Sequence, residues 1–128
     1  MSDINRRTEA FLSAVAGQDR GALKSCFVPT AVIRWPNTNE EFGLEDYLTA
    51  NCGYPGDWQG AVERVEETEQ GAVSVARIWA EDGSASLRVV SFFRFGEDGR
   101  IAELTEYYSD DGPVPQWRQE LGLGRRIR

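Results

Sequence analysis

The stretch Leu87–Asp111, LRVVSFFRFGEDGRIAELTEYYSDD, determines how the rest of the chain is interpreted. Two apolar segments within it, Leu87–Phe95 and Ile101–Tyr108, flank Gly96–Gly99, a short run of turn-forming residues. Two strand-like segments joined by such a loop are typical of a β-hairpin. The sequence therefore predicts a long hairpin close to the end of the chain.

A hairpin loop four residues wide predicts that Ser91 lies opposite Leu104 and Val89 opposite Glu106. Successive side chains of a strand point to opposite faces, so the hairpin residues fall into two sets. One face is predicted to carry Leu87, Val89, Ser91, Phe93, Ala102, Leu104, Glu106 and Tyr108. The other face is predicted to carry Arg88, Val90, Phe92, Arg94, Ile101, Glu103, Thr105 and Tyr107.

Glu106 is the residue that needs explaining, because its predicted face is otherwise apolar except for Ser91. One interpretation is a general acid or base whose pKa is raised by desolvation. The alternative is a carboxylate that pairs with an arginine such as Arg34, or that lies in water. We favour the functional interpretation, because burying an unpaired carboxylate is costly. Tyr108 shares the face and either donates a hydrogen bond to a ligand or simply packs.

Composition and charge narrow the class of protein. The 128 residues suffice for one domain, and 41% hydrophobic with 27% charged residues is ordinary for a globular protein. A net charge of −7 argues against binding to nucleic acid or to an anionic membrane. The chain has no apolar run of about 20 residues that would span a bilayer. The polar start, MSDINRRTE, does not resemble a secretory signal, so we expect a cytoplasmic protein.

The chain contains no histidine. This excludes Ser-His-Asp and Cys-His chemistry and argues against the usual zinc sites. Glycine-rich phosphate-binding motifs are also missing. Cys26 and Cys52 lack metal-like spacing and are expected to be free and buried. We therefore expect neither a metal nor another cofactor.

The segments before the hairpin predict helices first and strands afterwards. The expected order is a helix capped by Ser2 or Asp3 and ending at Gly17, a short helix from Asp19 to before Pro29, a strand over Ala31–Trp35, a polar loop over Asn37–Glu41, a helix from Leu44 to about Gly53, a strand over Trp58–Glu69 with a bulge or bend, and a strand over Ala72–Ala80. Residues 112–128 are expected to form a C-terminal tail of the single domain 1–128. This order is typical of an α+β fold.

Three N-terminal helices packed on a strongly bent antiparallel sheet would enclose a cone-shaped cavity. The residues expected to line it are Phe11, Val15, Trp35, Tyr54, Trp58, Val89, Ser91, Phe93 and Leu104. Trp35, Tyr54 and Trp58 flank loops at its wide end, where they form either an aromatic clamp or ordinary core. Arg34 and Trp35 alternate along one strand, so only one of them can point into the cavity.

This order of elements resembles the nuclear-transport-factor-2-like superfamily, and its SnoaL-like branch in particular. The segment FRFGEDGRIAELTEYYSDD is similar to the final hairpin of the bacterial ketosteroid isomerases. The resemblance implies a cone-shaped α+β barrel, a fold that hosts isomerases, cyclases, dehydratases, epoxide hydrolases and non-catalytic binders. It also implies a homodimer formed through the outer sheet face, where Val90, Phe92, Thr105 and Tyr107 are expected.

The isomerase residues are not present at the matching positions. The oxyanion-hole tyrosine falls at Phe11, the base aspartate at Trp35 and the second oxyanion-hole acid at Ser91. Steroid isomerisation by that mechanism is therefore not expected. In epoxide hydrolases of this fold, a carboxylate on the last strand belongs to an Asp-Arg-Asp set. Glu106 matches that position, but its acidic partner is not found on the neighbouring strand.

Together these observations predict a protein that binds a small hydrophobic or aromatic ligand. One hypothesis is a cofactor-independent lyase, isomerase, cyclase or hydrolase that uses Glu106. A second is a non-catalytic carrier or sensor with the same pocket. A third is an adaptor that binds a protein through the outer surface, which requires a filled cone.

Overall fold

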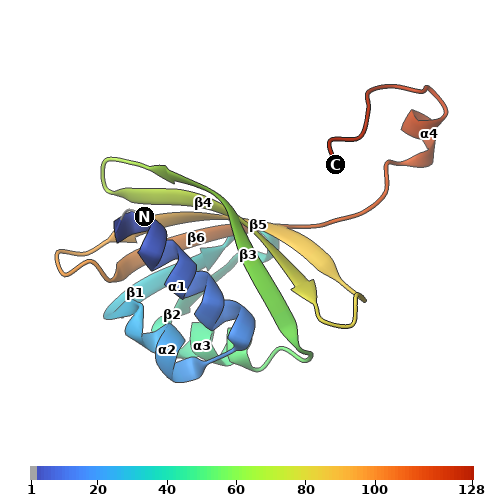
Figure 1. The fold of residues 1–128 in the computed structure, drawn as a ribbon. Helices are drawn as coiled ribbons and strands as arrows, with labels where there is room; N and C mark the ends of the chain where they lie inside the picture. Colours follow the sequence, from blue (N-terminus) through green and yellow to red (C-terminus); the bar gives the residue numbers. More distant parts are fainter. Residues whose placement is uncertain (1–2) are drawn as a thin grey trace.

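The computed structural model describes residues 3–128. Figure 1 shows helices gathered on one side of a curved sheet and a C-terminal segment that leaves the body. The elements in chain order are α1 (Asp3–Gly17), α2 (Arg20–Ser25), β1 (Phe27–Trp35), the 3-10 helix η1 (Pro36–Thr38), β2 (Glu40–Gly43), α3 (Leu44–Cys52), β3 (Trp58–Glu67), β4 (Gly71–Ala80), β5 (Ser86–Phe95), β6 (Ile101–Asp110) and α4 (Gln116–Gln119). The predicted α+β class is confirmed.

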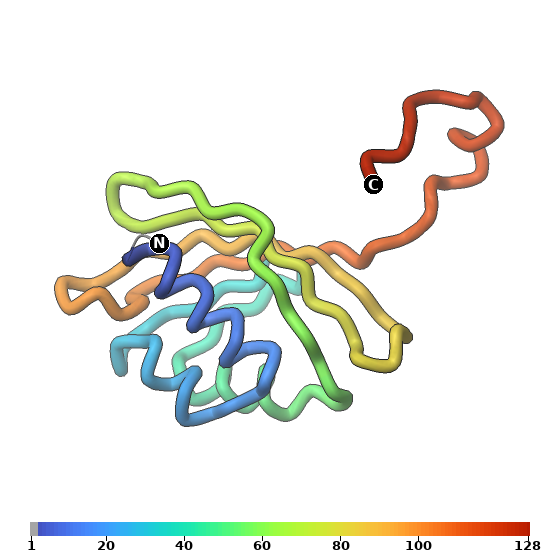
Figure 2. The backbone as a smooth tube through the Cα atoms, in the orientation of Figure 1, coloured from blue at the N-terminus to red at the C-terminus, as the bar shows by residue number. Residues whose placement is uncertain are grey.

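The strands form one six-stranded sheet in the order β2-β1-β6-β5-β4-β3. Neighbouring strands are antiparallel except β1 and β6, which run parallel. The prediction of a wholly antiparallel sheet is therefore wrong for this pair. The sheet curves around the helices without closing into a barrel (Figures 1 and 2). Helix α1 packs mainly on β3, and α3 packs on β1. The helices thus cover the concave face, where the core lies.

Local sequence signals set the ends of the helices. The Asp19 carboxylate caps α2 by accepting a hydrogen bond from the Ala22 backbone N–H at 3.1 Å. Helix α3 ends at Gly53, whose N–H bonds the Thr49 carbonyl. Helix α1 begins at Asp3. The alternative cap, Ser2, lies outside the described residues.

The hairpin forms as predicted, but its register differs by two residues. Ser91 lies opposite Glu106, rather than opposite Leu104, and Val89 lies opposite Tyr108. A shift of two residues keeps every side chain on its face, so these predicted faces hold. One residue of this shift arises at the loop, where Phe95 pairs with Ile101 instead of Arg100, and the second arises between Phe95 and Arg94.

A bulge at Ala102 explains the remaining error in the hairpin. Arg94 pairs with Glu103 and Phe95 with Ile101, so Ala102 is the extra residue of β6. This extra residue reverses which side chains point inward on the loop side of Ala102. Ile101, expected on the outer face, is instead buried in the core at 3% exposure. The irregularity expected in the acidic strand is confirmed in β3, where the register shifts between Val62 and Arg64.

Two elements were not expected. Residues 37–41 were predicted to form a polar loop, but Glu40–Gly43 forms the edge strand β2, paired with the end of β1. The tail contains the short helix α4, and every residue from Ser109 to the chain end is exposed. Figure 2 shows this tail running away from the helices. Among residues 3–128, no helix is both long and apolar enough to cross a membrane.

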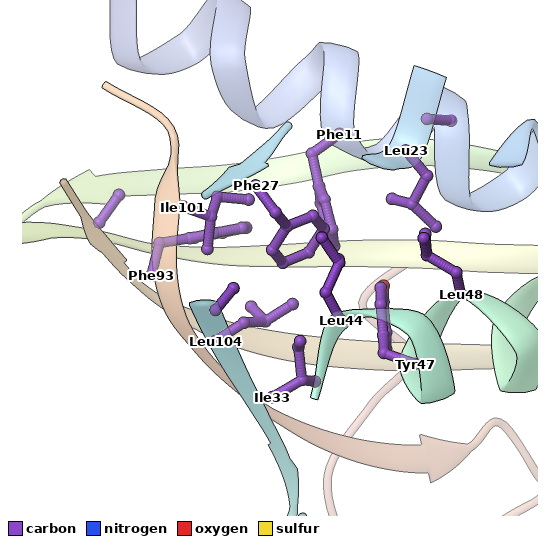
Figure 3. Close-up of a cluster of buried hydrophobic side chains, with 13 residues drawn as sticks. Phe11, Leu23, Phe27, Ile33, Leu44, Tyr47, Leu48, Phe93, Ile101 and Leu104 are labelled. Carbon is purple, nitrogen blue, oxygen red and sulfur yellow. The ribbon is translucent and has the colours of Figure 1, made fainter. Parts of the chain in front are cut away.

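The main core fills the space between the helices and β1, β5 and β6. Figure 3 shows Phe11 of α1, Leu23 of α2 and Tyr47 of α3 meeting the strand residues Phe27 and Phe93. The Phe11 and Phe93 rings pack edge-on, with their centroids 5.2 Å apart. Cys26 and Cys52 are free, but they are only partly buried at the margin of this cluster, because each stands at or beside the end of its helix.

Candidate functional site

A pocket of about 350 Å³ lies between α1, the segment after β1, the end of α3 and the concave sheet face. Its aromatic lining residues are Phe11, Trp35, Tyr54, Trp58 and Tyr108. Most of the other lining residues are aliphatic, alanine or small polar side chains. Among residues 3–128, the charged side chains that line it are Glu40 and Glu106, and both are acidic.

Glu106 is the buried polar centre of this pocket, with 3% of its surface exposed. Its carboxylate accepts three hydrogen bonds, all from neutral groups. The Trp35 indole Nε1–H donates to Oε1 at 3.1 Å, and the Tyr108 hydroxyl donates to the same oxygen at 3.0 Å. The Ser91 hydroxyl donates to Oε2 at 3.0 Å.

The sheet topology brings these residues together. Ser91 lies directly opposite Glu106 in the antiparallel β5–β6 pair, and Tyr108 follows Glu106 by two residues on the same face. Strand β1 lies on the other side of β6, where Arg34 pairs with Thr105. Its next residue, Trp35, therefore reaches Glu106 across the parallel pair.

Trp35 points into the pocket and Arg34 points out of it. The Arg34 guanidinium bonds the Glu41 carboxylate at 2.9 Å on the exposed side. The alternative in which Arg34 neutralises Glu106 is therefore wrong. Alternation along β1 allows only one of the two side chains inward, and β2 supplies the acidic partner that holds Arg34 outside.

Burial raises the pKa of Glu106, because desolvation disfavours the charged carboxylate. The hydrogen bonds from Trp35, Ser91 and Tyr108 act in the opposite direction but do not cancel this effect. Burial also raises the pKa of the Tyr108 hydroxyl well above its ordinary value, and the charge of Glu106 adds to the rise. Tyr108 is therefore a neutral donor near neutral pH.

The donors around Glu106 are held by their own neighbours. The Trp35 ring packs edge-on against Phe42, Tyr47 and Tyr108, with centroid distances of 4.7, 6.0 and 5.5 Å. The Tyr108 backbone N–H donates to Asn37 Oδ1 at 3.0 Å, which ties η1 to the end of β6. These contacts fix the direction from which the Trp35 and Tyr108 donors approach the carboxylate.

The aromatic pair Tyr54 and Trp58 stands beside the loop after α3. Their ring centroids are 5.5 Å apart, and Tyr54 is 60% exposed. The Trp58 indole donates to the Pro55 carbonyl at 3.0 Å, so it is fixed by the turn. Gln18 links this loop to α1 by donating to the carbonyls of Asn51 and Tyr54 at 3.0 and 2.6 Å.

Most of the residues expected in the cavity lie on the pocket surface. These are Phe11, Val15, Trp35, Tyr54, Trp58, Val89, Ser91, Glu106 and Tyr108. Phe93 and Leu104 do not line it, because they pair with each other deeper in the packed core. The register shift accounts for Leu104, because the residue opposite it is Phe93 and not the pocket residue Ser91.

Part of the pocket wall comes from residues that the sequence did not single out. Ser74, Ala76 and Ile78 of β4 line it, as do Asn37 of η1 and Glu40 of β2. The β4 residues carried a usable signal, because strand alternation separates them from Val73, Val75 and Arg77. Asn37 and Glu40 carried none, since their placement depends on how η1 and β2 fold.

The described residues offer little to a metal ion. Over positions 3–128, no three Cys, Asp or Glu side chains come together in a group that could hold one. The Glu106 carboxylate is surrounded by the neutral hydrogen-bond donors Trp35, Ser91 and Tyr108 rather than by further carboxylates. The arrangement instead suits a hydrogen bond from, or a proton transfer with, an organic molecule.

Comparison with known proteins agrees with this fold. Residues 8–104 match the SnoaL-like domain. A search of curated proteins found no significant match. The match to the domain covers most of the chain, including Trp35 and Ser91, and ends just before Glu106. The chain therefore belongs to the SnoaL-like family.

Solved structures show the same architecture at low sequence identity. An NTF-2-like protein of unknown function from Burkholderia xenovorans is 21% identical with a TM-score of 0.77, over 98% of this chain and 95% of that one. A candidate ketosteroid isomerase from Kribbella flavida is 22% identical with a TM-score of 0.76, over 96% and 88%. An LEH-like epoxide hydrolase from M. tuberculosis is 17% identical with a TM-score of 0.65, over 81% and 80%. These similarities establish the fold.

Proposed function

We propose that this protein binds a small, largely apolar molecule in the pocket, with Glu106 as the anchor for the polar group of the ligand. The observation that carries the proposal is the environment of Glu106. It is 3% exposed, it lines a pocket of about 350 Å³ and it is bonded by neutral donors. Burying a carboxylate costs desolvation free energy, and a ligand that bonds the carboxylate would offset this cost.

The carboxylate retains capacity for that partner. Two carboxylate oxygens together accept about four hydrogen bonds. Oε1 already accepts from Trp35 and Tyr108, whereas Oε2 accepts from Ser91. An O–H or N–H of the ligand can therefore donate to Oε2, while its hydrocarbon part contacts lining residues such as Val15 and Val89.

A second candidate function is enzymatic, and the raised pKa of Glu106 favours it. A carboxylate whose pKa is raised toward the working pH is a stronger general base. Glu106 Oε2 would take a proton from a substrate carbon or from a water molecule, in a cofactor-independent lyase, isomerase, cyclase or hydrolase reaction. The fold similarity to an epoxide hydrolase supports this class of chemistry. The remaining alternatives are a carrier or sensor and a protein-binding adaptor. The adaptor requires a cone filled by side chains, and the open pocket of about 350 Å³ argues against it.

We also propose that the protein forms a homodimer through the outer sheet face. Phe92 and Tyr107 are 47% and 45% exposed there, with ring centroids 6.1 Å apart. Beside them, Arg94 and Glu103 form an ion pair with an N–O distance of 2.8 Å. Adjacent exposed aromatic side chains on one sheet face are typical of a surface covered by a partner.

Native mass spectrometry of the purified protein tests ligand binding directly. We expect a co-purifying small molecule in the wild type and its loss or weakening in Glu106→Gln. Glu103→Gln is the matched control, because Glu103 lies on the same strand but faces outward to Arg94. Equal ligand occupancy in wild type and E106Q would contradict the role of Glu106. Detection of converted product with the wild type, but not with E106Q, would distinguish an enzyme from a carrier.

A further inference from the structure

The charges around the pocket point to the class of its ligand. We infer that the ligand is a hydrophobic amine whose positively charged nitrogen binds Glu106. This inference rests on the proposed function, because it requires that the pocket binds a ligand through this carboxylate. It adds the sign of the ligand's charge.

The pocket lacks a positive charge to balance Glu106. Among residues 3–128 neither lysine nor arginine lines it, and its charged side chains are Glu40 and Glu106. A buried carboxylate is normally paired with a cation or neutralised by a proton. Since the described part of the chain provides no cation at this site, an ammonium group from the ligand would complete it.

The outer surface provides a comparison within the same sheet. Glu103 is three residues before Glu106 on β6 and pairs with Arg94 at 2.8 Å. Glu63 of β3 pairs with Arg88 at 3.1 Å. These partly exposed carboxylates have arginine partners, although water could solvate them. Glu106 is buried and has the greater need of a counter-charge, yet its donors within residues 3–128 are all neutral.

The aromatic lining of the pocket also suits a cation. Phe11, Trp35, Tyr54, Trp58 and Tyr108 surround the pocket together with aliphatic side chains. Aromatic rings attract ammonium groups through their negative faces while also contacting the alkyl substituents. A buried carboxylate in an aromatic pocket therefore matches both ends of a bulky alkylamine. The net charge of −7 on the whole chain favours the approach of a cation as well.

Isothermal titration calorimetry with two compounds of equal shape tests the inference. The probes are 1-adamantylamine, which is a cation near neutral pH, and 1-adamantanol, which is neutral. We expect wild type to bind the amine about tenfold or more tightly than the alcohol, because hydrogen bonds between charged groups are stronger than neutral ones. Cyclohexylamine and cyclohexanol form a smaller pair that repeats the comparison.

The variants locate the preference. In Glu106→Gln the advantage of the amine over the alcohol should disappear, whereas Glu103→Gln should retain it. If E106Q fails to fold, the comparison of amine with alcohol on wild type decides. Wild type that binds the alcohol at least as tightly as the amine overturns the inference and leaves the proposed function standing. Wild type that binds none of the four compounds contradicts both.

Discussion

Ser91 and Glu106 lie directly opposite each other on β5 and β6, and the Ser91 hydroxyl donates to Glu106 Oε2 at 3.0 Å. Both side chains are buried, with exposures of 2% and 3%. The pair occupies the concave face, so its hydrogen bond is part of the pocket wall. Any change at Ser91 therefore acts on the protonation and the ligand contacts of Glu106.

Ser91→Ala removes the described donor to Oε2 and leaves a buried acceptor without that partner. We expect the free energy of unfolding to fall by about 1–2 kcal/mol and the pKa of Glu106 to rise further. Urea denaturation and carbon NMR of the Glu106 carboxyl group measure the two effects. Ser74→Ala is the control, because Ser74 lies opposite Ser91 on β4 and is also buried. An unchanged Glu106 pKa in S91A would contradict the assignment.

Glu106→Gln should change how stability depends on pH. The folded pKa of Glu106 is raised, so the folded state holds the proton more tightly than the unfolded chain does. This stabilisation is complete below the ordinary glutamate pKa of about 4.3 and is lost as pH rises through the folded pKa. We therefore expect the unfolding free energy of wild type minus that of E106Q to fall across this range. At neutral pH, E106Q should be folded and at least as stable as wild type.

Urea denaturation over a pH series checks this expectation. Glu103→Gln should give a small trend of opposite sign, because Arg94 lowers the pKa of Glu103 and its contribution is lost as pH falls. A difference between wild type and E106Q that does not vary with pH would show that Glu106 is not desolvated. Unfolding of E106Q at every pH would identify a structural role instead.

The hairpin shows how far the sequence could predict this fold. Alternation placed Ser91, Glu106 and Tyr108 on one face, and a register error of two residues could not alter that result. The bulge at Ala102 was invisible, because it depends on how Phe95 and Ile101 pair around the loop. Strand β2 was missed because its residues, EEFG, carry little strand signal and pair only through the end of β1.

The site was predictable in its centre but not in its partners. Glu106 stood out as a charge on an apolar face, whereas its contact with Trp35 depends on the parallel β1–β6 pairing of segments 71 residues apart. Local sequence could not choose between Arg34 and Trp35 for the inward position. The choice is made by β2, which places Glu41 beside Arg34 on the outside.

Replacing outer-face aromatic residues should separate the proposed dimer. Phe92→Glu and Tyr107→Glu introduce charges where the interface is expected to be apolar, and burying an unpaired charge is costly. We expect monomers by light scattering, with the melting temperature of the monomer little changed. Val114→Glu, an exposed apolar residue of the tail, is the control. Wild type that is already monomeric at micromolar concentration would contradict the proposal.

Chelation should leave the protein unaffected. Over positions 3–128, no group of three potential metal ligands comes together, and the chain contains no histidine. We expect EDTA to leave both the melting temperature and the binding of the adamantane probes unchanged. A melting temperature that falls with EDTA and recovers with one particular metal would contradict this expectation.

Trp35→Phe should separate the hydrogen bond to Glu106 from the packing of the aromatic ring. The variant removes the indole donor to Oε1 but keeps a ring against Phe42, Tyr47 and Tyr108. We expect the unfolding free energy to fall by about 1–2 kcal/mol, for the lost hydrogen bond and the smaller ring. The pKa of Glu106 should rise, because one of the groups that favour its charged form is lost.

Carbon NMR of the Glu106 carboxyl group measures this pKa shift. Trp79→Phe is the control, because Trp79 stacks with Arg77, 4.5 Å from its guanidinium, and does not line the pocket. The control should leave the titration of Glu106 in place even if stability falls. An equal Glu106 pKa in W35F and wild type would mean that the indole N–H does not stabilise the carboxylate. Because Tyr108 still donates to Oε1, a ligand held through Oε2 should bind W35F more weakly rather than not at all.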